Sequence, residues 1–269
     1  MQRTVSGIVY LIIIIGSLFL GKYGFGAVFL LAGILALLEF YELNGIPGTN
    51  TVPILGIAAA AVIFILSFLV TAQMGESRLL TVVLSLPVLL FIASLYSSVS
   101  DPVKSLGIVL LGIVYVVIPL AAMNYLVFPA VNDHVYTHRI VLGILTLVWI
   151  NDTGAYVAGT LLGRHRLFPR ISPKKSWEGL AGGTILTMAT AWWMTDIMGI
   201  LSQTDWIILG GVASVFGVYG DLAESLIKRK ADRKDSGALI PGHGGVLDRI
   251  DSILFVMPVS FLYLMIKGL

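Results

Sequence analysis

The stretch from Ser225 to Asp251, SLIKRKADRKDSGALIPGHGGVLDRID, lies between two long apolar segments, residues 206–227 and 250–266. It contains six Lys or Arg residues, four Asp residues and one His residue. A helix needs about 20 mostly apolar residues to cross the hydrocarbon core of a bilayer. The pattern therefore predicts two membrane helices joined by a charged loop, with acidic and basic side chains converging at one membrane face.

This charged loop has two interpretations. Basic loops commonly do no more than set the orientation of neighbouring helices, and charge alone favours that simpler interpretation. However, carboxylates can bind a divalent cation, Lys and Arg can bind phosphate oxygens, and Gly244 and Gly245 beside His243 let the backbone approach a ligand closely. The ordered run from Pro241 to Asp251 favours the second interpretation, a site for nucleotide-phosphate chemistry.

The composition of the 269 residues is that of a membrane protein, because 57% are hydrophobic, 12% are charged and the mean hydropathy is +0.95. Soluble domains carry about 25% charged residues. Residues 1–150 hold only 10 of the 32 charged residues, so we expect the chemistry in the second half. The net charge of +2 gives no support for a nucleic-acid partner. Without Cys, metal ligands must be oxygen or nitrogen atoms, which favours a hard cation.

Apolar segments of spanning length predict an all-α, polytopic integral membrane protein with about nine transmembrane helices and a polar cavity open to the cytoplasm. The predicted spans are residues 5–20, 24–43, 52–72, 79–96, 103–127, 140–162, 180–200, 206–227 and 250–266. A boundary near Thr137 separates an N-terminal hydrophobic region of five helices, residues 1–137, from a C-terminal catalytic region of four helices, residues 138–269.

Lys and Arg gather in two loops, residues 163–178 and the segment after Ile227. Cytoplasmic loops are enriched in these residues. Because two predicted spans separate the loops, one orientation places both in the cytoplasm, with the amino terminus inside and the carboxyl terminus outside. The sequence thus predicts a multi-pass protein of the cell membrane whose active site faces the cytoplasm.

Several carboxylates lie inside predicted spans or at their ends. Asp152 falls near the middle of an apolar segment, where an ionised carboxylate costs about 2.5–3.5 kcal/mol. That cost favours a functional residue, and the alternative is a packing residue hydrogen-bonded between helices. Asp221, Glu224 and Lys228 share one helix face. If the helices on either side of the charged loop pack together, Asp221 and Asp248 can bind one or two cations.

Two further groups are ambiguous from spacing alone. The segment from Ile171 to Gly179, ISPKKSWEG, suits an anionic head group, but its lysines also fit a purely topological role near anionic lipid. Glu39 and Glu42 lie on one face near a cytoplasmic helix end, and pairing with lysine or an interfacial position is favoured over catalysis.

At fixed spacings, the charged loop resembles the pattern of phosphatidate cytidylyltransferases, also called CDP-diacylglycerol synthases. The matching positions are Ser225, Lys228, Arg229, Lys234, Asp235, Gly237, Pro241, His243, Gly244, Gly245, Asp248, Arg249 and Asp251. The resemblance extends upstream over the Asp-Thr-Gly-Ala-Tyr run at Asp152 and the Ser-Pro-Lys-Lys run. It covers roughly the second half of the chain.

The resemblance implies transfer of the cytidylyl group of CTP to phosphatidic acid in phospholipid biosynthesis, by a nucleotidyltransferase in the lipid bilayer. It implies Mg²⁺ as cofactor, with a second cation or a homo-oligomer left open. The expected metal ligands are Asp221, Asp248, Asp152 and Asp251. The expected catalytic residues are Asp221, Asp248, Lys228 and Arg249. The expected substrate-binding residues are Ser172, Lys174, Lys175, Glu224, Arg229, His243, Gly244 and Gly245.

Two other classes of protein fit parts of the pattern. A transporter also contains intramembrane carboxylates and broken helices, but it does not need a dense phosphate-matching loop at one face. A CTP-dependent lipid kinase would use the same ligand types and would move only the terminal phosphoryl group. The fate of the α-phosphate of CTP distinguishes these classes.

Overall fold

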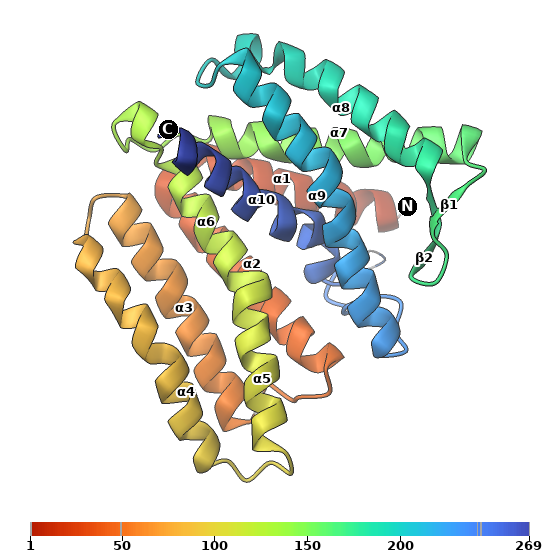
Figure 1. Ribbon diagram of the computed structural model, residues 1–269. Coiled ribbons are helices and arrows are strands. Elements are labelled where there is room, and N and C mark those ends of the chain that lie inside the picture. Colours follow the sequence, from red (N-terminus) through yellow and green to blue (C-terminus); the bar gives the residue numbers. More distant parts are fainter. Residues whose placement is uncertain (1, 49, 241, 243, 269) are drawn as a thin grey trace.

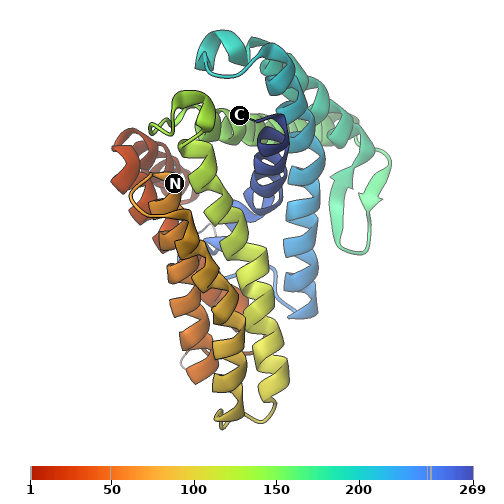
Figure 2. The ribbon, with the colours of Figure 1, turned by 60° about the vertical axis from the view of Figure 1, so that its left-hand side comes forward.

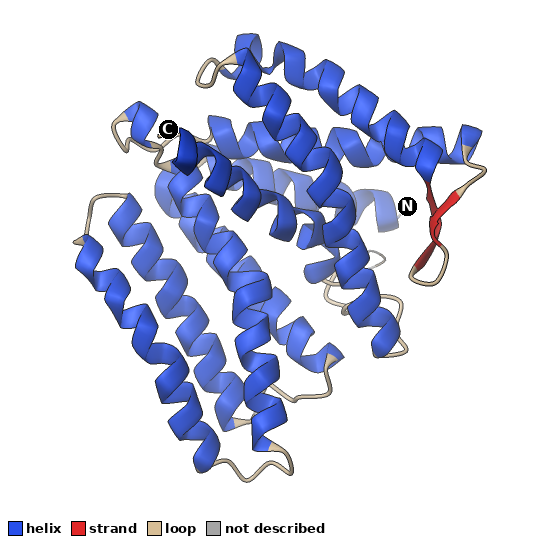
Figure 3. Cartoon of the chain, viewed as in Figure 1, coloured by secondary structure: helices blue, strands red, loops and turns tan. Residues whose placement is uncertain are grey.

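Helices make up most of the protein, and the only strands in the described residues form one small hairpin (Figures 1 and 3). The computed structural model describes residues 2–48, 50–240, 242 and 244–268. In chain order the elements are α1 (Gln2–Phe19), α2 (Gly21–Leu43), α3 (Thr51–Thr71), η1 (Ser77–Ser85), α4 (Leu86–Leu95), α5 (Pro102–Gly112), η2 (Ile113–Val117), α6 (Ile118–Val127), η3 (Ala130–Asn132), α7 (Arg139–Leu162), β1 (Arg166–Phe168), β2 (Ser172–Ser176), α8 (Trp177–Met198), α9 (Gln203–Lys230) and α10 (Leu247–Lys267). Each predicted span is helical within the described residues, and the all-α fold class is confirmed.

Within the described ranges, seven helical segments are long and apolar enough to cross a membrane. They are Gly21–Leu43, Thr51–Thr71, Ser77–Leu95, Pro102–Asn132, Arg139–Leu162, Gln203–Lys230 and Leu247–Lys267. α1 has only a shorter apolar part, Ser6–Phe19, and α8 is rich in Gly, Thr and Trp. The protein is therefore polytopic, while nine spans stay a prediction.

The long run from α5 to α6 contains a π-helical segment, η2, just before Pro119. Proline lacks a backbone N–H and its ring clashes with the preceding turn of an α-helix. A wider π turn is one of the local adjustments that membrane helices use around such residues. The helix thus continues through the proline, and a single apolar segment results.

Small residues bring α7 and α8 into close contact. A Cβ at Gly182 would lie 2.2 Å from the Cβ of Ala158, and one at Gly183 would lie 2.7 Å from the backbone oxygen of Asn151. Such residues at helix crossings allow the backbones of membrane helices to approach closely. This contact fixes the position of Asp152, the residue after Asn151, relative to α8.

The loop predicted between α7 and α8 forms an antiparallel hairpin, β1–β2, in which Arg166 pairs with Ser176 and Phe168 with Ser172. Pro169 and Arg170 lie in the turn between the strands. The hairpin extends away from the helices at one edge of the molecule (Figure 1). It carries the Ser-Pro-Lys-Lys run on β2.

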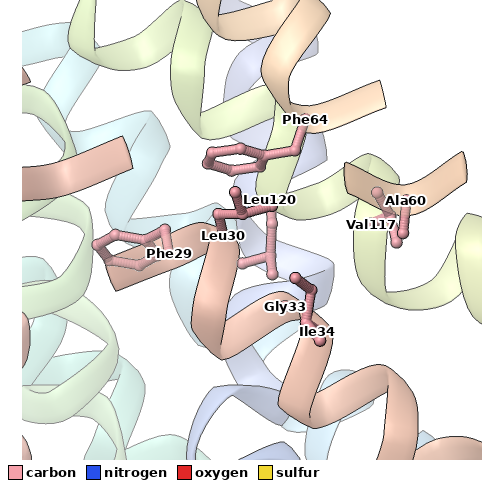
Figure 4. Close-up of a pocket in the computed structure, with 8 residues that line it drawn as sticks. All are labelled: Phe29, Leu30, Gly33, Ile34, Ala60, Phe64, Val117 and Leu120. Atoms are coloured by element: carbon pink, nitrogen blue, oxygen red, sulfur yellow. The ribbon is translucent and has the colours of Figure 1, made fainter. Parts of the chain in front are cut away.

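α10 joins the two parts of the chain, because it packs against α6 and α2 of the N-terminal region and against α9 and α7 of the C-terminal region. Figures 1 and 2 show three neighbouring helical segments, which are α3, α4 and the α5–α6 run. α10 lies between α6 and α9. A small cavity of about 10 Å³ remains in the N-terminal region among apolar side chains, including Phe29, Phe64 and Leu120 (Figure 4). Its lining residues have no polar side chains, so it is a packing gap.

Contacts that involve the loops and the neighbouring helix ends group the loops into two ends of the molecule. One end joins loops predicted to be cytoplasmic, through Arg233–Glu42 and Lys175–Asp221. The other end joins loops predicted to be external, through Tyr136–Leu18 and Lys267–Asp205. The sidedness that the Lys and Arg distribution predicts is therefore consistent with the folded contacts.

Candidate active site

α9 and α10 enclose a lysine between two carboxylates. Lys228 Nζ donates to Glu224 Oε2 at 2.5 Å and to Asp248 Oδ1 at 2.6 Å. Lys228 and Glu224 lie one turn apart near the end of α9, and Asp248 lies in the first turn of α10. The three side chains are 12%, 1% and 6% exposed, respectively. α9 and α10 thus pack side by side, as the metal-site prediction required.

The loop before α10 also holds Asp248. Asp248 Oδ2 accepts the N–H groups of Gly245 at 2.7 Å and Ser236 at 2.9 Å, and Ser236 Oγ lies 2.9 Å away. Gly244 has a φ of +81°, and a Cβ there would lie 2.5 Å from Asp248 Oδ2. Both carboxylate oxygens of Asp248 are therefore engaged, one by Lys228 and the other by the loop.

Asp221 pairs with the hairpin instead. Lys175 Nζ on β2 lies 2.8 Å from Asp221 Oδ2, and Ser225 Oγ donates to Asp221 Oδ1 at 3.2 Å. The side chains of Lys175 and Asp221 are 23% and 38% exposed. The structure thus brings together two groups that the sequence had placed in separate lipid-binding and metal-binding roles.

Glu178, in the first turn of α8, fixes the base of the hairpin. Its carboxylate accepts the backbone N–H groups of Arg164 and His165 at 3.1 Å and 3.2 Å and lies 2.6 Å from His165 Nδ1. The hydrogen bond with His165, followed by those from backbone N–H groups, lowers the pKa of Glu178 to about 2. The carboxylate is consequently ionised at neutral pH and keeps its acceptor role.

A cavity of about 480 Å³ opens beside these groups, between α1, α7 and α10. Its charged lining consists of Asp152, Asp248, Arg249 and Asp251, while α1 contributes Ser6, Gly7, Ile8, Tyr10 and Leu11. Tyr10 also donates its hydroxyl proton to the backbone oxygen of Arg249 at 3.0 Å. The wall is partly polar and partly apolar, and α1 forms much of the apolar part.

Asp152 and Asp251 line this cavity, and with Asp221 they form an acidic group whose carboxylates are close enough to repel one another. Lys175 offsets part of this repulsion at Asp152, and Lys228 does so at Asp251. The four predicted metal ligands thus divide into this group of three and Asp248, which belongs to the hydrogen-bonded loop.

The oxygen ligands near the cavity fit Mg²⁺ by type, but their number limits the kind of site that they can form. Mg²⁺ takes oxygen ligands and is commonly held by one or two carboxylates together with substrate phosphates and water. The side chain of Asp221 is 38% exposed, and Asp152 and Asp251 lie near it. Among the described residues, no three Asp, Glu or His side chains are assembled into a cage for a metal ion. A site of one or two carboxylates that needs the nucleotide is therefore the arrangement that fits.

The other predicted residues lie around this centre. Ser172 begins β2 and is partly exposed, Lys174 is exposed on the same strand, and Glu224 is fully buried. Arg229 is exposed and its Nη1 donates to the backbone oxygen of Arg233 at 3.3 Å. His243 lies outside the described residues.

Sequence reasoning missed the part played by Glu39. Its carboxylate on α2 contacts the loop before α10, through the N–H groups of Val246 and Leu247 and the hydroxyl of Ser236. The expected lysine partner is wrong for this residue, because these contacts involve backbone and a hydroxyl group. For Glu42 the partner is a different basic residue, Arg233, at 3.0 Å. A buried carboxylate at the polar end of an apolar helix was the available signal.

Known proteins match the chain along its whole length. A model of the Cytidylyltransferase family matches residues 1–267. The chain is similar to a phosphatidate cytidylyltransferase of Staphylococcus haemolyticus (strain JCSC1435), with 32% identity over 260 residues, which are 96% of this chain and 96% of the relative. Proteins of the same name from Staphylococcus aureus (strain COL) and Staphylococcus epidermidis are 44% and 45% identical, each over 45% of this chain and 47% of the relative. The chain belongs to the cytidylyltransferase family.

Proposed function

We propose that this protein transfers the cytidylyl group of CTP to phosphatidic acid, forming CDP-diacylglycerol and pyrophosphate. Family membership and relatives named phosphatidate cytidylyltransferase support this reaction. The observation that carries the proposal is the meeting of Lys175, Lys228 and Arg249 with the acidic group at one end of membrane-length helices. Cations for phosphate oxygens and carboxylates for a metal are what two reacting phosphate groups require.

The reaction needs positioning and charge stabilisation more than proton transfer. The second pKa of a phosphate monoester is about 6, so the phosphate of phosphatidate is largely dianionic at neutral pH. One of its oxygens attacks the α-phosphorus of CTP, the bond from that phosphorus to the bridging oxygen breaks, and pyrophosphate leaves with the electron pair. Two anions must meet, so the site has to hold both and offset their charge.

The basic residues divide naturally between the two substrates. Lys228, Arg229 and Arg249 would neutralise the leaving pyrophosphate, while Lys174 and Lys175 on β2 would orient phosphatidate. In the structure Lys228 and Lys175 are paired with carboxylates, so phosphate oxygens would share or replace those partners. The full burial of Glu224 favours a role in holding Lys228 over direct contact with substrate.

A bound Mg²⁺ would supply positive charge that offsets the negative charge developing on pyrophosphate. Asp221 would hold it, with Asp152 or Asp251 as the second carboxylate. Asp248 would then serve the site through Lys228 and the loop, because its side chain is 6% exposed and its oxygens bind Lys228 and two loop N–H groups. This division refines the expectation that Asp221 and Asp248 are the main pair of ligands.

The cavity suits substrates that arrive from different phases. Phosphatidate carries acyl chains and comes from the bilayer, whereas CTP is a water-soluble polyanion. A wall with both charged and apolar residues can accept a phosphate and the start of an acyl chain. The two basic loops at the same end support a position of this site at the cytoplasmic face of the cell membrane, because cytoplasmic loops are enriched in Lys and Arg.

Incubation of the purified protein with phosphatidate, Mg²⁺ and CTP labelled at the α-phosphate tests the reaction, with separation of the lipid products. We expect the label in a lipid that comigrates with CDP-diacylglycerol. Label that enters lipid only from the γ-phosphate would identify a lipid kinase, and no lipid label from either position would contradict the proposal. Asp133→Asn is a control for carboxylate removal, since Asp133 lies in an exposed turn at the other end with a φ of 49°, which Asn tolerates.

A further inference from the structure

Glu39 is a buried carboxylate in the N-terminal region that accepts hydrogen bonds from the loop leading into α10 and from the first residue of that helix. Its Oε1 accepts the N–H of Val246 at 2.9 Å, and its Oε2 accepts the N–H of Leu247 at 2.8 Å. Ser236 Oγ lies 3.0 Å from Oε2. The side chain is 8% exposed, so these hydrogen bonds replace the water that an ionised carboxylate would otherwise need.

The loop is shaped around this carboxylate. A Cβ at Gly237 would lie 2.7 Å from Glu39 Oε1, and a Cβ at Gly245 would lie 2.2 Å from Oε2. Neither position could carry a side chain while Glu39 keeps its place. The two glycines therefore let the backbone close over the end of the Glu39 side chain.

Glu39 also supplies the N-terminal cap that α10 does not provide for itself. Val246 occupies the N-cap position and has no side-chain hydrogen bond to the helix. The first N–H groups of a helix have no partner within the helix, and a carboxylate there is favourable for both hydrogen bonding and the helix dipole. Here that carboxylate comes from α2, more than 200 residues away in the chain.

A single hydroxyl links Glu39 to the site. Ser236 Oγ lies 3.0 Å from Glu39 Oε2 and 2.9 Å from Asp248 Oδ2, so its proton can serve either carboxylate. The same oxygen accepts the N–H of Asp248 at 3.3 Å. Through this contact the position of Glu39 determines where Asp248 lies, and Asp248 in turn holds Lys228.

We propose that Glu39 is a positioning residue for the cytidylyl-transfer reaction: it holds Ser236, Val246 and Leu247 in place, so that Asp248 and Arg249 line the cavity and Asp248 keeps its contact with Lys228. The role rests on the proposed function of the site. It assigns to the N-terminal region a direct part in building the active site. Glu39 does not touch the reacting atoms in this arrangement, and it acts through Ser236 and the backbone.

Glu39→Gln tests the role, because Gln has almost the same size but turns an NH₂ group toward one of the N–H donors. Residues that support a site from behind typically contribute about 10–100-fold to activity, and we expect a loss of kcat in that range. The KM for phosphatidate should stay within about twofold, since the hairpin lysines bind the lipid in this scheme. Hydrogen exchange at the amides of Val246 and Leu247 should become faster.

Glu42→Gln is the matched control. Glu42 lies almost one turn further along α2 and contacts the same loop through Arg233, but its side chain is 64% exposed. Exposed ion pairs contribute little to stability, so this variant should keep the wild-type kcat and the wild-type exchange rate at Val246 and Leu247. Ser236→Ala is a second test variant, because it removes only the hydroxyl link and should lower kcat in the same direction.

Each result has a distinct meaning. If Glu39→Gln keeps about a third or more of the wild-type kcat, or loses activity only in proportion to its folded fraction, the positioning role is wrong. Failure of both Glu39→Gln and Ser236→Ala to fold would likewise assign Glu39 to folding alone. If the wild type and Glu42→Gln make no labelled lipid, the proposed reaction fails, while the exchange rates at Val246 and Leu247 still report whether Glu39 holds the loop.

Discussion

Asp221 and Asp248 carry the same functional group in different surroundings. Asp221 is 38% exposed and its partners are the side chains of Lys175 and Ser225, whereas Asp248 is 6% exposed and also accepts two backbone N–H groups. Removal of charge at Asp221 leaves the loop intact. Removal of charge at Asp248 disturbs Lys228 and two backbone N–H groups at once, so the two residues should respond differently to one substitution.

We expect Asp221→Asn to lower turnover below about a tenth of wild type while the melting temperature barely changes, since exposed ion pairs contribute little to stability. Asp248→Asn should lose turnover and also about 1–3 kcal/mol of stability, because its NH₂ group would face a buried donor. Activity at saturating Mg²⁺ and thermal unfolding measure both effects. Equal melting temperatures for the two variants, or an active Asp221→Asn, would contradict this assignment.

At the scale of one element, the hairpin places two neighbouring lysines in unequal positions. Lys174 is exposed, whereas Lys175 pairs with Asp221 on α9. Glu178 holds the hairpin base against α8. The hairpin is therefore both a surface for an anionic head group and a part of the acidic centre.

Lys174→Ala and Lys175→Ala should each raise the KM for phosphatidate more than the KM for CTP. Lys175→Ala should also lower kcat, because Asp221 loses its partner and the repulsion among the three carboxylates is less offset. Steady-state kinetics with each substrate varied in turn measure this pattern. A larger effect on CTP would move the hairpin to the nucleotide, and unchanged KM values would return both lysines to a topological role.

At the scale of the whole molecule, the contacts at the two ends predict which loops share a side of the membrane. The Lys and Arg distribution then predicts which side each loop occupies. The absence of Cys makes the test direct, because a single introduced Cys is then the only thiol. Val135 is 61% exposed at one end, and Lys230 is exposed at the other. We expect a membrane-impermeant maleimide to label Val135→Cys in intact cells and Lys230→Cys only after permeabilisation. The reverse labelling would invert the proposed orientation.

The helical segments were predictable from the sequence to within a few residues. For example, residues 140–162 were predicted as a span and α7 extends over Arg139–Leu162. In a bilayer every backbone polar group needs an internal partner, so about 20 apolar residues leave little choice except a helix. The hairpin was not predicted, because a short charged loop satisfies its backbone in water and carries no strong periodicity.

Hydropathy identifies a polytopic helical membrane protein from its sequence, and residue positions show that the charged residues collect in two loops and at the ends of neighbouring helices. Hydropathy and spacing are local properties, and both conclusions depend only on them. The tertiary structure alone decided the partners: Lys175 with Asp221, Lys228 with Asp248, and Glu39 with the start of α10. A pattern of charges in the sequence does not show which carboxylate binds which partner. The hydrogen bonds depend on distances between helices that are far apart in the chain.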